Sequence, residues 1–313
     1  MLRQRIQTSA ILIGFTVPLL LLDAYFPLGG APGLWLLPLL LTFSLGTARD
    51  VSKLLQRTNR KIWRPGTMIA TAIVCVLGFV PMFWPLFGEV YPPDCSVGRA
   101  GWIVVGAVAA VFFGLICELL RYGDAPAGAL DRTLSSVFVS IYVGIPLTIF
   151  AVIRGMYPEG AQPEPDANVV LSDAAANRWG MAALLTLIIV TKMSDIGAYA
   201  VGKLIGRHKM TPRLSPNKTW EGAAGGVMFS TIAAWLCLHV MFPLLCGDQF
   251  STAPSWGWLI LGPVLGISGM YGDLAESLIK RDAGAKDSGD SLPGLGGYWD
   301  VTDSLIASSM PGF

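Results

Sequence analysis

Long apolar runs follow one another along almost the whole chain, and they constrain the fold more than any other feature. Eight of them approach the roughly 20 residues that a helix needs to cross the hydrocarbon core of a bilayer. They lie at 9–26, 33–48, 67–87, 101–120, 134–153, 179–202, 222–245 and 256–279. A further apolar segment, 304–313, is too short to cross, and we expect it only to enter the membrane. The sequence therefore predicts an all-α polytopic membrane protein with about eight to nine transmembrane helices.

The composition excludes a water-soluble protein and a nucleic-acid partner. Hydrophobic residues make up 53% of the chain and charged residues only 14%, whereas soluble domains carry about 25% charged residues. The formal net charge is +1, so there is no basic excess that would bind nucleic acid. The 5 cysteines include no CxxC spacing, which argues against a thiolate metal site.

The basic residues predict the orientation, because loops on the cytoplasmic side retain Lys and Arg. With the N-terminus inside, only Arg99, Arg154 and Arg178 fall in outside connections, Lys192 lies within a crossing, and the rest of the 22 fall inside. We therefore expect a cytoplasmic N-terminus and a bacterial-type inner (cytoplasmic) membrane. The chain divides into a five-helix part at 1–153, an extracytoplasmic loop at 154–178 and a C-terminal part at 179–313.

Ionisable residues inside the apolar runs gather in the C-terminal part. Each costs roughly 2.5 to 3.5 kcal/mol at mid-helix, so their presence usually marks function. At 100° per residue, Lys192, Asp195, Tyr199 and Lys203 fall on one narrow stripe of the sixth helix. The alternative is an ion pair between Lys192 and Asp195 that only fixes packing.

The eighth predicted helix repeats this arrangement with Asp273, Glu276, Ser277 and Lys280. Two polar faces at the same expected depth predict a shared wet cavity near the cytoplasmic surface.

The segment after the eighth helix is rich in charges and glycines. Its charged residues include Arg281, Lys286, Asp287, Asp290, Asp300 and Asp303. Clustered carboxylates with few His or Cys suit a hard cation such as Mg²⁺, and glycines allow the backbone to approach a ligand closely. The sequence thus predicts a phosphate-handling metal site at the inner membrane surface, unless this segment is only a solvated charged tail.

The connection 203–221 is strongly basic. It contains Ser215, Lys218 and Thr219 just before a helix whose positive N-terminal end we expect to face a phosphate. The alternative is a loop that only sets the topology and contacts anionic lipids. Such a loop would not require these residues in this order.

These motifs together resemble the phosphatidate cytidylyltransferase (CDP-diacylglycerol synthase) family. The resemblance rests on 194–199 (SDIGAY), 215–222 (SPNKTWEG), 272–277 (GDLAES) and the glycine-rich segment that ends at Asp303. It covers roughly 191–303, whereas the first five helices resemble the family only in hydropathy. The chain departs from the family pattern at Leu295, where a His usually stands, at Val301 in place of Arg, and at Asn217 in place of a common Lys.

The resemblance implies transfer of a cytidylyl group from CTP to phosphatidic acid, which yields CDP-diacylglycerol and pyrophosphate for phospholipid biosynthesis. It implies Mg²⁺ held by Asp273 and Asp300, a second cation for which K⁺ is one candidate, and a homodimer. The expected catalytic residues are Asp195, Asp273, Asp300 and Asp303. The expected substrate-binding residues are Arg213, Ser215, Lys218, Thr219, Glu276, Lys280, Arg281, Lys286 and Asp287.

Three other functions remain open at this point. A CTP-dependent transferase acting on an isoprenoid lipid would need the same polar groups, and nothing in the apolar runs decides between the two lipids. An inactive homologue is suggested by Leu295 and Val301. An ion-coupled transporter would line its path with Lys192, Asp195 and Asp273, but no matching polar set approaches from the outside, as alternating access would require.

Overall fold

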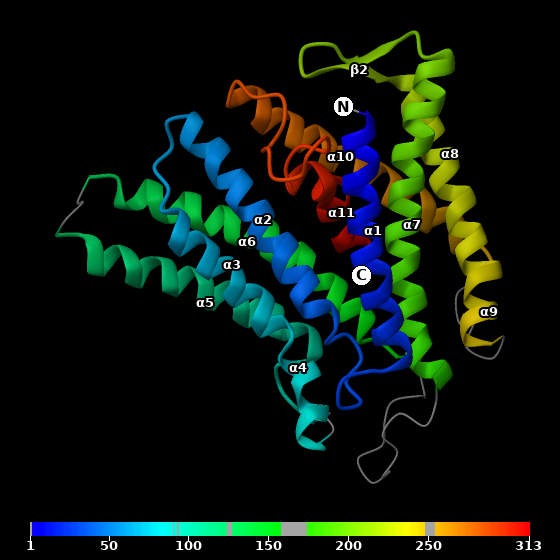
Figure 1. Cartoon of the computed structure of the whole chain (residues 1–313), viewed down its shortest axis with the longest axis horizontal. Coiled ribbons are helices and arrows are strands. Elements are labelled where there is room, and N and C mark those ends of the chain that lie inside the picture. The colour runs from blue at the N-terminus through cyan, green and yellow to red at the C-terminus, as the bar shows by residue number, and fades with distance from the viewer. Residues whose placement is uncertain (1, 90, 93, 124–126, 158–173, 248–253) are drawn as a thin grey trace. The chain divides into compact units, whose positions relative to one another are not determined.

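The computed structural model describes residues 2–89, 91–92, 94–123, 127–157, 174–247 and 254–313, and these are almost entirely helical (Figure 1). The α-helices are α1 (Leu2–Tyr25), α2 (Leu36–Arg57), α3 (Arg64–Gly78), α4 (Val80–Phe83), α5 (Gly98–Arg121), α6 (Ala129–Arg154), α7 (Ala174–Ile205), α8 (Trp220–Leu236), α9 (Phe242–Cys246), α10 (Trp258–Asp282) and α11 (Trp299–Gly312). A 3-10 turn, η1 (Trp84–Phe87), and a π-helical turn, η2 (Cys237–Met241), extend α4 and α8. The predicted all-α class is confirmed.

Among the described residues, 6 helices are long and apolar enough to cross a membrane, or up to 7 if the bent pair of α3 and Val80–Phe87 is one crossing. The bend of 54° lies beside Pro81 and Pro85, which lack the N–H that a straight helix requires. The second predicted crossing, 33–48, is helical from Leu36 onward. However, α2 continues past it to Arg57 and is too rich in charge to count among the six.

Two segments of the prediction differ from the described structure or fall outside it. Residues 158–173 of the predicted loop 154–178 lie outside the described residues. The helix that contains the C-terminal apolar segment begins before residue 304, because α11 starts at Trp299 and includes both Asp300 and Asp303.

The chain forms two compact units. Unit 1 combines Met1–Val152 with Ile279–Thr302, and unit 2 combines Ile153–Leu278 with Asp303–Phe313. The glycine-rich segment between α10 and α11, residues 283–298, therefore belongs to unit 1 with the N-terminal helices. Most of α10 and of α11 belongs to unit 2 with α7 and α8.

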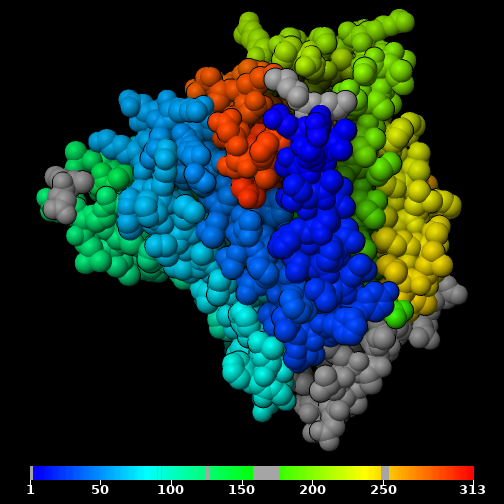
Figure 2. Space-filling model, in the orientation of Figure 1, coloured from blue at the N-terminus to red at the C-terminus, as the bar shows by residue number. Residues whose placement is uncertain are grey.

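Unit 1 is built around α3, which packs against α2 and α5. Ala70, Val74 and Ala110 form a buried apolar cluster between these helices, and Phe113 and Ile145 pack against it. At the surface of this unit, the segment 279–302 (orange-red) lies beside α1 (dark blue) in Figure 2. One hydrogen bond, 2.7 Å from the Thr8 hydroxyl to the Pro293 carbonyl, joins α1 to this segment.

Unit 2 is a bundle in which small residues bring helix backbones close together. Helices α7 and α8 run side by side (Figure 1), and a Cβ at Gly197 of α7 would lie only 2.7 Å from the Gly225 carbonyl of α8. Gly266 of α10 accepts a hydrogen bond of 3.3 Å from the Ser194 hydroxyl of α7. Such contacts are the usual way for helices to associate where the surrounding lipid is as apolar as their side chains. They fix α7, α8 and α10 as one scaffold.

The basic connection before α8 is a β-hairpin rather than a plain loop. Strands β1 (Lys209–Thr211) and β2 (Ser215–Thr219) pair antiparallel, with Lys209 opposite Thr219. The hairpin ends at Thr219, whose hydroxyl accepts the Gly222 N–H at 3.1 Å and so caps α8.

Candidate active site

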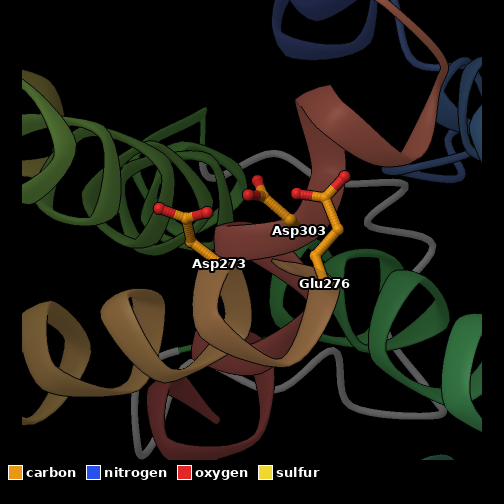
Figure 3. A group of neighbouring side chains, drawn as sticks. All are labelled: Asp273, Glu276 and Asp303. Atoms are coloured by element: carbon orange, nitrogen blue, oxygen red, sulfur yellow. The ribbon is translucent and has the colours of Figure 1, made fainter. Parts of the chain in front are cut away.

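Three carboxylates of unit 2 turn toward one common space (Figure 3). Asp273 and Glu276 come from one face of α10, and Asp303 comes from α11; one oxygen of each lies within 4.8 Å of the others. Glu276 and Asp303 are buried, whereas the Asp273 side chain is 41% exposed. Gly272 makes this possible, because a Cβ there would collide with the Asp303 backbone.

This cluster fits a hard divalent cation by the chemistry of its donors. Three ionised carboxylates so close together repel one another, and a cation or a proton must offset that repulsion. Mg²⁺ prefers oxygen ligands and is usually held by one or two carboxylates together with water and substrate phosphates. The partly exposed Asp273 leaves room for such additional ligands.

One cation of the protein already reaches the cluster. Lys218, at the end of β2, places its Nζ 2.8 Å from an Asp273 oxygen and 3.4 Å from the Met270 carbonyl. The Lys218 side chain is 21% exposed, so it lies at the edge of the cluster. A phosphate bound to the carboxylates through a cation would meet this ammonium group.

Two backbone N–H groups at the N-terminus of α8, which we expect to face a phosphate, already have partners within the protein. The Trp220 N–H donates to the His208 carbonyl at 2.9 Å, and the Gly222 N–H donates to Thr219. Thr219 therefore acts as a helix cap. The predicted contacts of Ser215, Lys218 and Thr219 with a phosphate stay predictions.

The polar stripe predicted on α7 is confirmed. Lys192 donates to Asp195 at 3.3 Å, and the Lys203 ammonium lies 3.4 Å from the Tyr199 hydroxyl. Ser304 of α11 joins the first pair, since it accepts from Lys192 at 2.8 Å and donates to Asp195 at 3.0 Å. This triad links α7 to the helix that carries Asp303.

Asp300, in unit 1, is surrounded by hydrogen-bond donors. One oxygen accepts the Lys280 ammonium at 2.8 Å. The other accepts the Ser288 N–H at 2.9 Å, the Ser288 hydroxyl at 2.6 Å and the Gly297 N–H at 2.7 Å. Burial raises the pKa of Asp300, but the Lys280 and Ser288 side chains and the Gly297 N–H outweigh it, so the pKa lies below its ordinary value.

The donors around Asp300 give it a structural role in the glycine-rich segment. Its bonds tie residue 288 and residue 297 to the first turn of α11, and Gly296 between them has a φ of 98°, which favours glycine. The predicted role of Asp300 as a metal ligand stays a prediction.

Asp50 is a residue of this region that the sequence reasoning missed. It is fully buried on α2, and its Oδ2 accepts the Tyr298 N–H at 2.7 Å. Within the described part of the chain, no hydrogen bond reaches Oδ1, which faces Gly289. Burial raises the pKa of Asp50 above its ordinary value, although the Tyr298 N–H and Lys53 oppose this. The sequence feature that could have identified Asp50 is its position as a lone acid directly after an apolar run, between Arg49 and Lys53.

The predicted site residues thus fall into two groups. Those in unit 2 are Asp195, Arg213, Ser215, Lys218, Thr219, Asp273, Glu276 and Asp303; those in unit 1 are Lys280, Arg281, Lys286, Asp287 and Asp300. Unit 2 brings together the carboxylates and Lys218, whereas Arg213 is exposed in the turn between the strands. In unit 1, Lys280 binds Asp300, and Arg281, Lys286 and Asp287 are exposed.

Comparisons with known proteins agree with the resemblance. The sequence pattern of the cytidylyltransferase family matches residues 3–311. A phosphatidate cytidylyltransferase of Haemophilus influenzae is 38% identical over 129 residues, which is 41% of this chain and 43% of that relative. One from Mycobacterium leprae is 38% identical over 278 residues, covering 78% of this chain and 83% of the relative. One from Chlamydia trachomatis is 31% identical over 244 residues, covering 78% and 69%.

The matches therefore differ in extent: the chain spans less than half of the Haemophilus relative and most of the other two. The family pattern, in contrast, includes the N-terminal helices as well as the motifs around the carboxylates. Because it covers nearly the whole chain, and two relatives above 30% identity match 78% of it, the chain belongs to the cytidylyltransferase family.

Proposed function

We propose that this protein transfers a cytidylyl group from CTP to phosphatidic acid and thereby forms CDP-diacylglycerol for phospholipid biosynthesis. A phosphate oxygen of phosphatidate forms a bond to the α-phosphorus of CTP. The bond from that phosphorus to the bridging oxygen breaks, and pyrophosphate leaves with the electron pair. The observation that carries the proposal is the carboxylate cluster of Asp273, Glu276 and Asp303 with Lys218 beside it, in a chain of this family.

The residues of unit 2 suit this reaction because it depends on positioning and on neutralisation of charge. Asp273, Glu276 and Asp303 would hold Mg²⁺, which when bound supplies positive charge to the phosphates. Lys218 offers a second positive group 2.8 Å from Asp273, at the exposed edge of the cluster. Lys192, Asp195 and Ser304 keep α7 and α11 together, so that Asp303 stays in place.

We infer the membrane arrangement from the distribution of basic residues. The N-terminus and the site lie on the cytoplasmic side of a bacterial inner membrane, and α2 adds a crossing to the apolar helices. Labelling of single cysteines with an impermeant maleimide in spheroplasts tests this. We expect Glu89→Cys to react and Arg207→Cys to react only after the membrane is opened; the reverse pattern contradicts the orientation.

We also expect a homodimer, on the strength of the family resemblance. Chemical crosslinking in native membranes measures it, and a chain that stays monomeric there contradicts the expectation.

The reaction is tested with the purified chain in detergent, labelled CTP, Mg²⁺ and a panel of lipid phosphates. We expect a labelled CDP-lipid with phosphatidate, and at least about a hundredfold slower formation when Asp273→Asn replaces the wild type. A preference for an isoprenyl phosphate would assign the chain to the related isoprenoid reaction. No CDP-lipid with any lipid phosphate would refute the proposal.

A further inference from the structure

Unit 1 contains an open cavity between α2 and the glycine-rich segment, of a size suited to a small ligand. Its volume is about 730 Å³, within the range of roughly 300 to 1,000 Å³ that is usual for such sites. The residues that line it include Arg49, Lys53, Arg57, Lys286, Ser291 and Tyr298. We call this cavity the α2 groove.

Cations from two separate elements face the α2 groove. Arg49, Lys53 and Arg57 follow one another at intervals of four residues, so they share one face of α2 at steps of about 6 Å. Lys286 adds a fourth cation from the glycine-rich segment.

These four cations exceed the acids around them. Asp287 and Asp290 also line the groove, yet among the described residues no ion pair joins either of them to one of the four cations. The neighbouring Arg60 differs, because it pairs with Asp131 at 3.4 Å and does not line the groove. The buried Asp50 also interacts electrostatically with Lys53, so four cations stand against three acids and the groove carries a small net positive charge.

Hydroxyl groups complete the polar lining, and the wall that carries them is firmly held. Tyr298 is fixed by its N–H bond to Asp50, and its ring packs edge-on against Phe43 at 5.8 Å. Gly46 of α2 provides the space for this ring, since a Cβ there would overlap it. Ser291 adds a second hydroxyl. A polar lining of this kind does not suit an acyl chain.

We propose that the α2 groove binds a phosphate-bearing group of a substrate. The shared chemistry is that of a nucleotide triphosphate and of a phosphatidate headgroup, and the proposal rests on the function proposed above. Guanidinium groups match phosphate oxygens through two parallel hydrogen bonds, and a Lys adds a point charge. Arg49, Lys53 and Arg57 are thus binding residues as well as markers of topology.

Two matched substitutions test this in the full chain purified in detergent: Lys53→Gln and Arg57→Gln, with Arg60→Gln as the control. Equilibrium binding is measured for CTP, for inorganic tripolyphosphate and for the soluble short-chain lipid dihexanoyl phosphatidate. These readouts do not require turnover. We expect each groove variant to raise Kd for one class of probe about tenfold, since a charge-assisted hydrogen bond is lost, and Arg60→Gln to change it less than twofold.

The pattern of loss identifies the source of the phosphate. Weaker binding of CTP and tripolyphosphate, with phosphatidate unchanged, assigns the groove to the nucleotide; the reverse assigns it to the lipid. Lys53→Arg should keep binding near the wild-type value, which separates the loss of a cation from a loss of folding. Affinities for all three probes that match those of Arg60→Gln would overturn the inference. A wild type that binds these probes but forms no CDP-lipid would instead refute only the proposed function.

Discussion

Asp300 and Asp303 stand three residues apart on α11, yet their surroundings differ sharply. Asp303 lies in a group of three carboxylates, whereas the two oxygens of Asp300 accept hydrogen bonds from Lys280, Ser288 and Gly297. The first arrangement leaves negative charge that a bound cation can offset. The second is neutralised by the protein itself.

The difference indicates that acids close together in the sequence have separate roles, one in binding a ligand and the other in holding the backbone. The unit 2 cluster is suited to hold a ligand, and the unit 1 carboxylates, Asp300 and Asp50, are suited to shape the glycine-rich segment. Substitutions in the two groups of acids test these separate roles.

The largest effect is expected for the unit 2 cluster. Asp273→Asn should lower the rate at least about a hundredfold, some 2.7 kcal/mol of barrier, because phosphate charge would lose its counter-ion. Initial rates over a Mg²⁺ titration measure this, and thermal unfolding should stay close to that of the wild type. Near-normal turnover with an unchanged Mg²⁺ requirement would show that Asp273 is not a metal ligand.

Substitution of the unit 1 carboxylates, Asp300 and Asp50, should change the free energy of unfolding rather than the catalytic rate. Asp300→Asn removes the carboxylate charge that Lys280 contacts at 2.8 Å and turns an amide toward backbone donors, so we expect a loss of about 2 kcal/mol in unfolding free energy. Asp50→Asn keeps an acceptor for Tyr298 and removes a buried charge, so it should be neutral or stabilising at pH 7. Thermal unfolding in detergent compares the two variants. Equal losses would contradict the separate roles assigned here.

The pH dependence of these two acids should have opposite signs. The pKa of Asp300 is lowered by folding, so its contribution is present above its unfolded pKa of about 3.9 and is lost as the pH falls through the lower folded pKa. The pKa of Asp50 is raised, so its contribution falls as the pH rises from about 3.9 through the folded pKa. Unfolding curves of the wild type, compared with those of both variants from about pH 2 to about pH 7, measure these slopes.

The sequence predicted what depends on local pattern. Apolar length located the 6 described helices that are long and apolar enough to cross a membrane, although not the predicted number of eight to nine. A period of 3.6 residues placed Lys192 with Asp195 and Asp273 with Glu276, which the structure confirms. Such neighbours lie on the same helix, so their proximity requires no knowledge of tertiary packing.

The sequence could not predict what depends on contacts between distant segments. The bond from Tyr298 to Asp50 spans 248 positions, and the bond from Lys192 to Ser304 spans 112. Lys53 and Arg60 carry the same positive-inside signal, yet only Lys53 lines the α2 groove. The hairpin was missed because its strands have only 3 and 5 residues, and because Pro212 and Pro216 are not typical of strands.

A smaller effect is expected at the edge of the carboxylate cluster. Lys218→Ala should lower kcat/KM for CTP about twentyfold, because it removes a charged phosphate contact 2.8 Å from Asp273. Lys209→Ala is the matched control, since Lys209 is an exposed cation of the same hairpin. Steady-state kinetics with varied CTP measures both. Similar small changes in kcat/KM in the two variants would show that Lys218 does not contact CTP and only helps to set the membrane orientation.

The smallest effect is expected at Leu295, where the resemblance leads one to expect a histidine. Leu295 lies in the turn that closes the glycine-rich segment, and its N–H donates to the Leu292 carbonyl at 2.9 Å. If that histidine were an essential general base, this chain would be inactive. The attacking phosphate monoester, however, has a second pKa of about 6, so at neutral pH it is mostly dianionic and needs no base.

Lack of the histidine should therefore cost about one hydrogen bond, roughly 0.5 to 1.5 kcal/mol. We expect an active wild type in which Leu295→His changes turnover by about tenfold or less, far below the loss in Asp273→Asn. Rates of both variants at pH 7, with saturating CTP and phosphatidate, make the comparison. A wild type that is inactive on every lipid phosphate but is switched on by Leu295→His would make the histidine indispensable. It would also place a catalytic group in the glycine-rich segment, to which we assign binding and structural roles but no catalytic step.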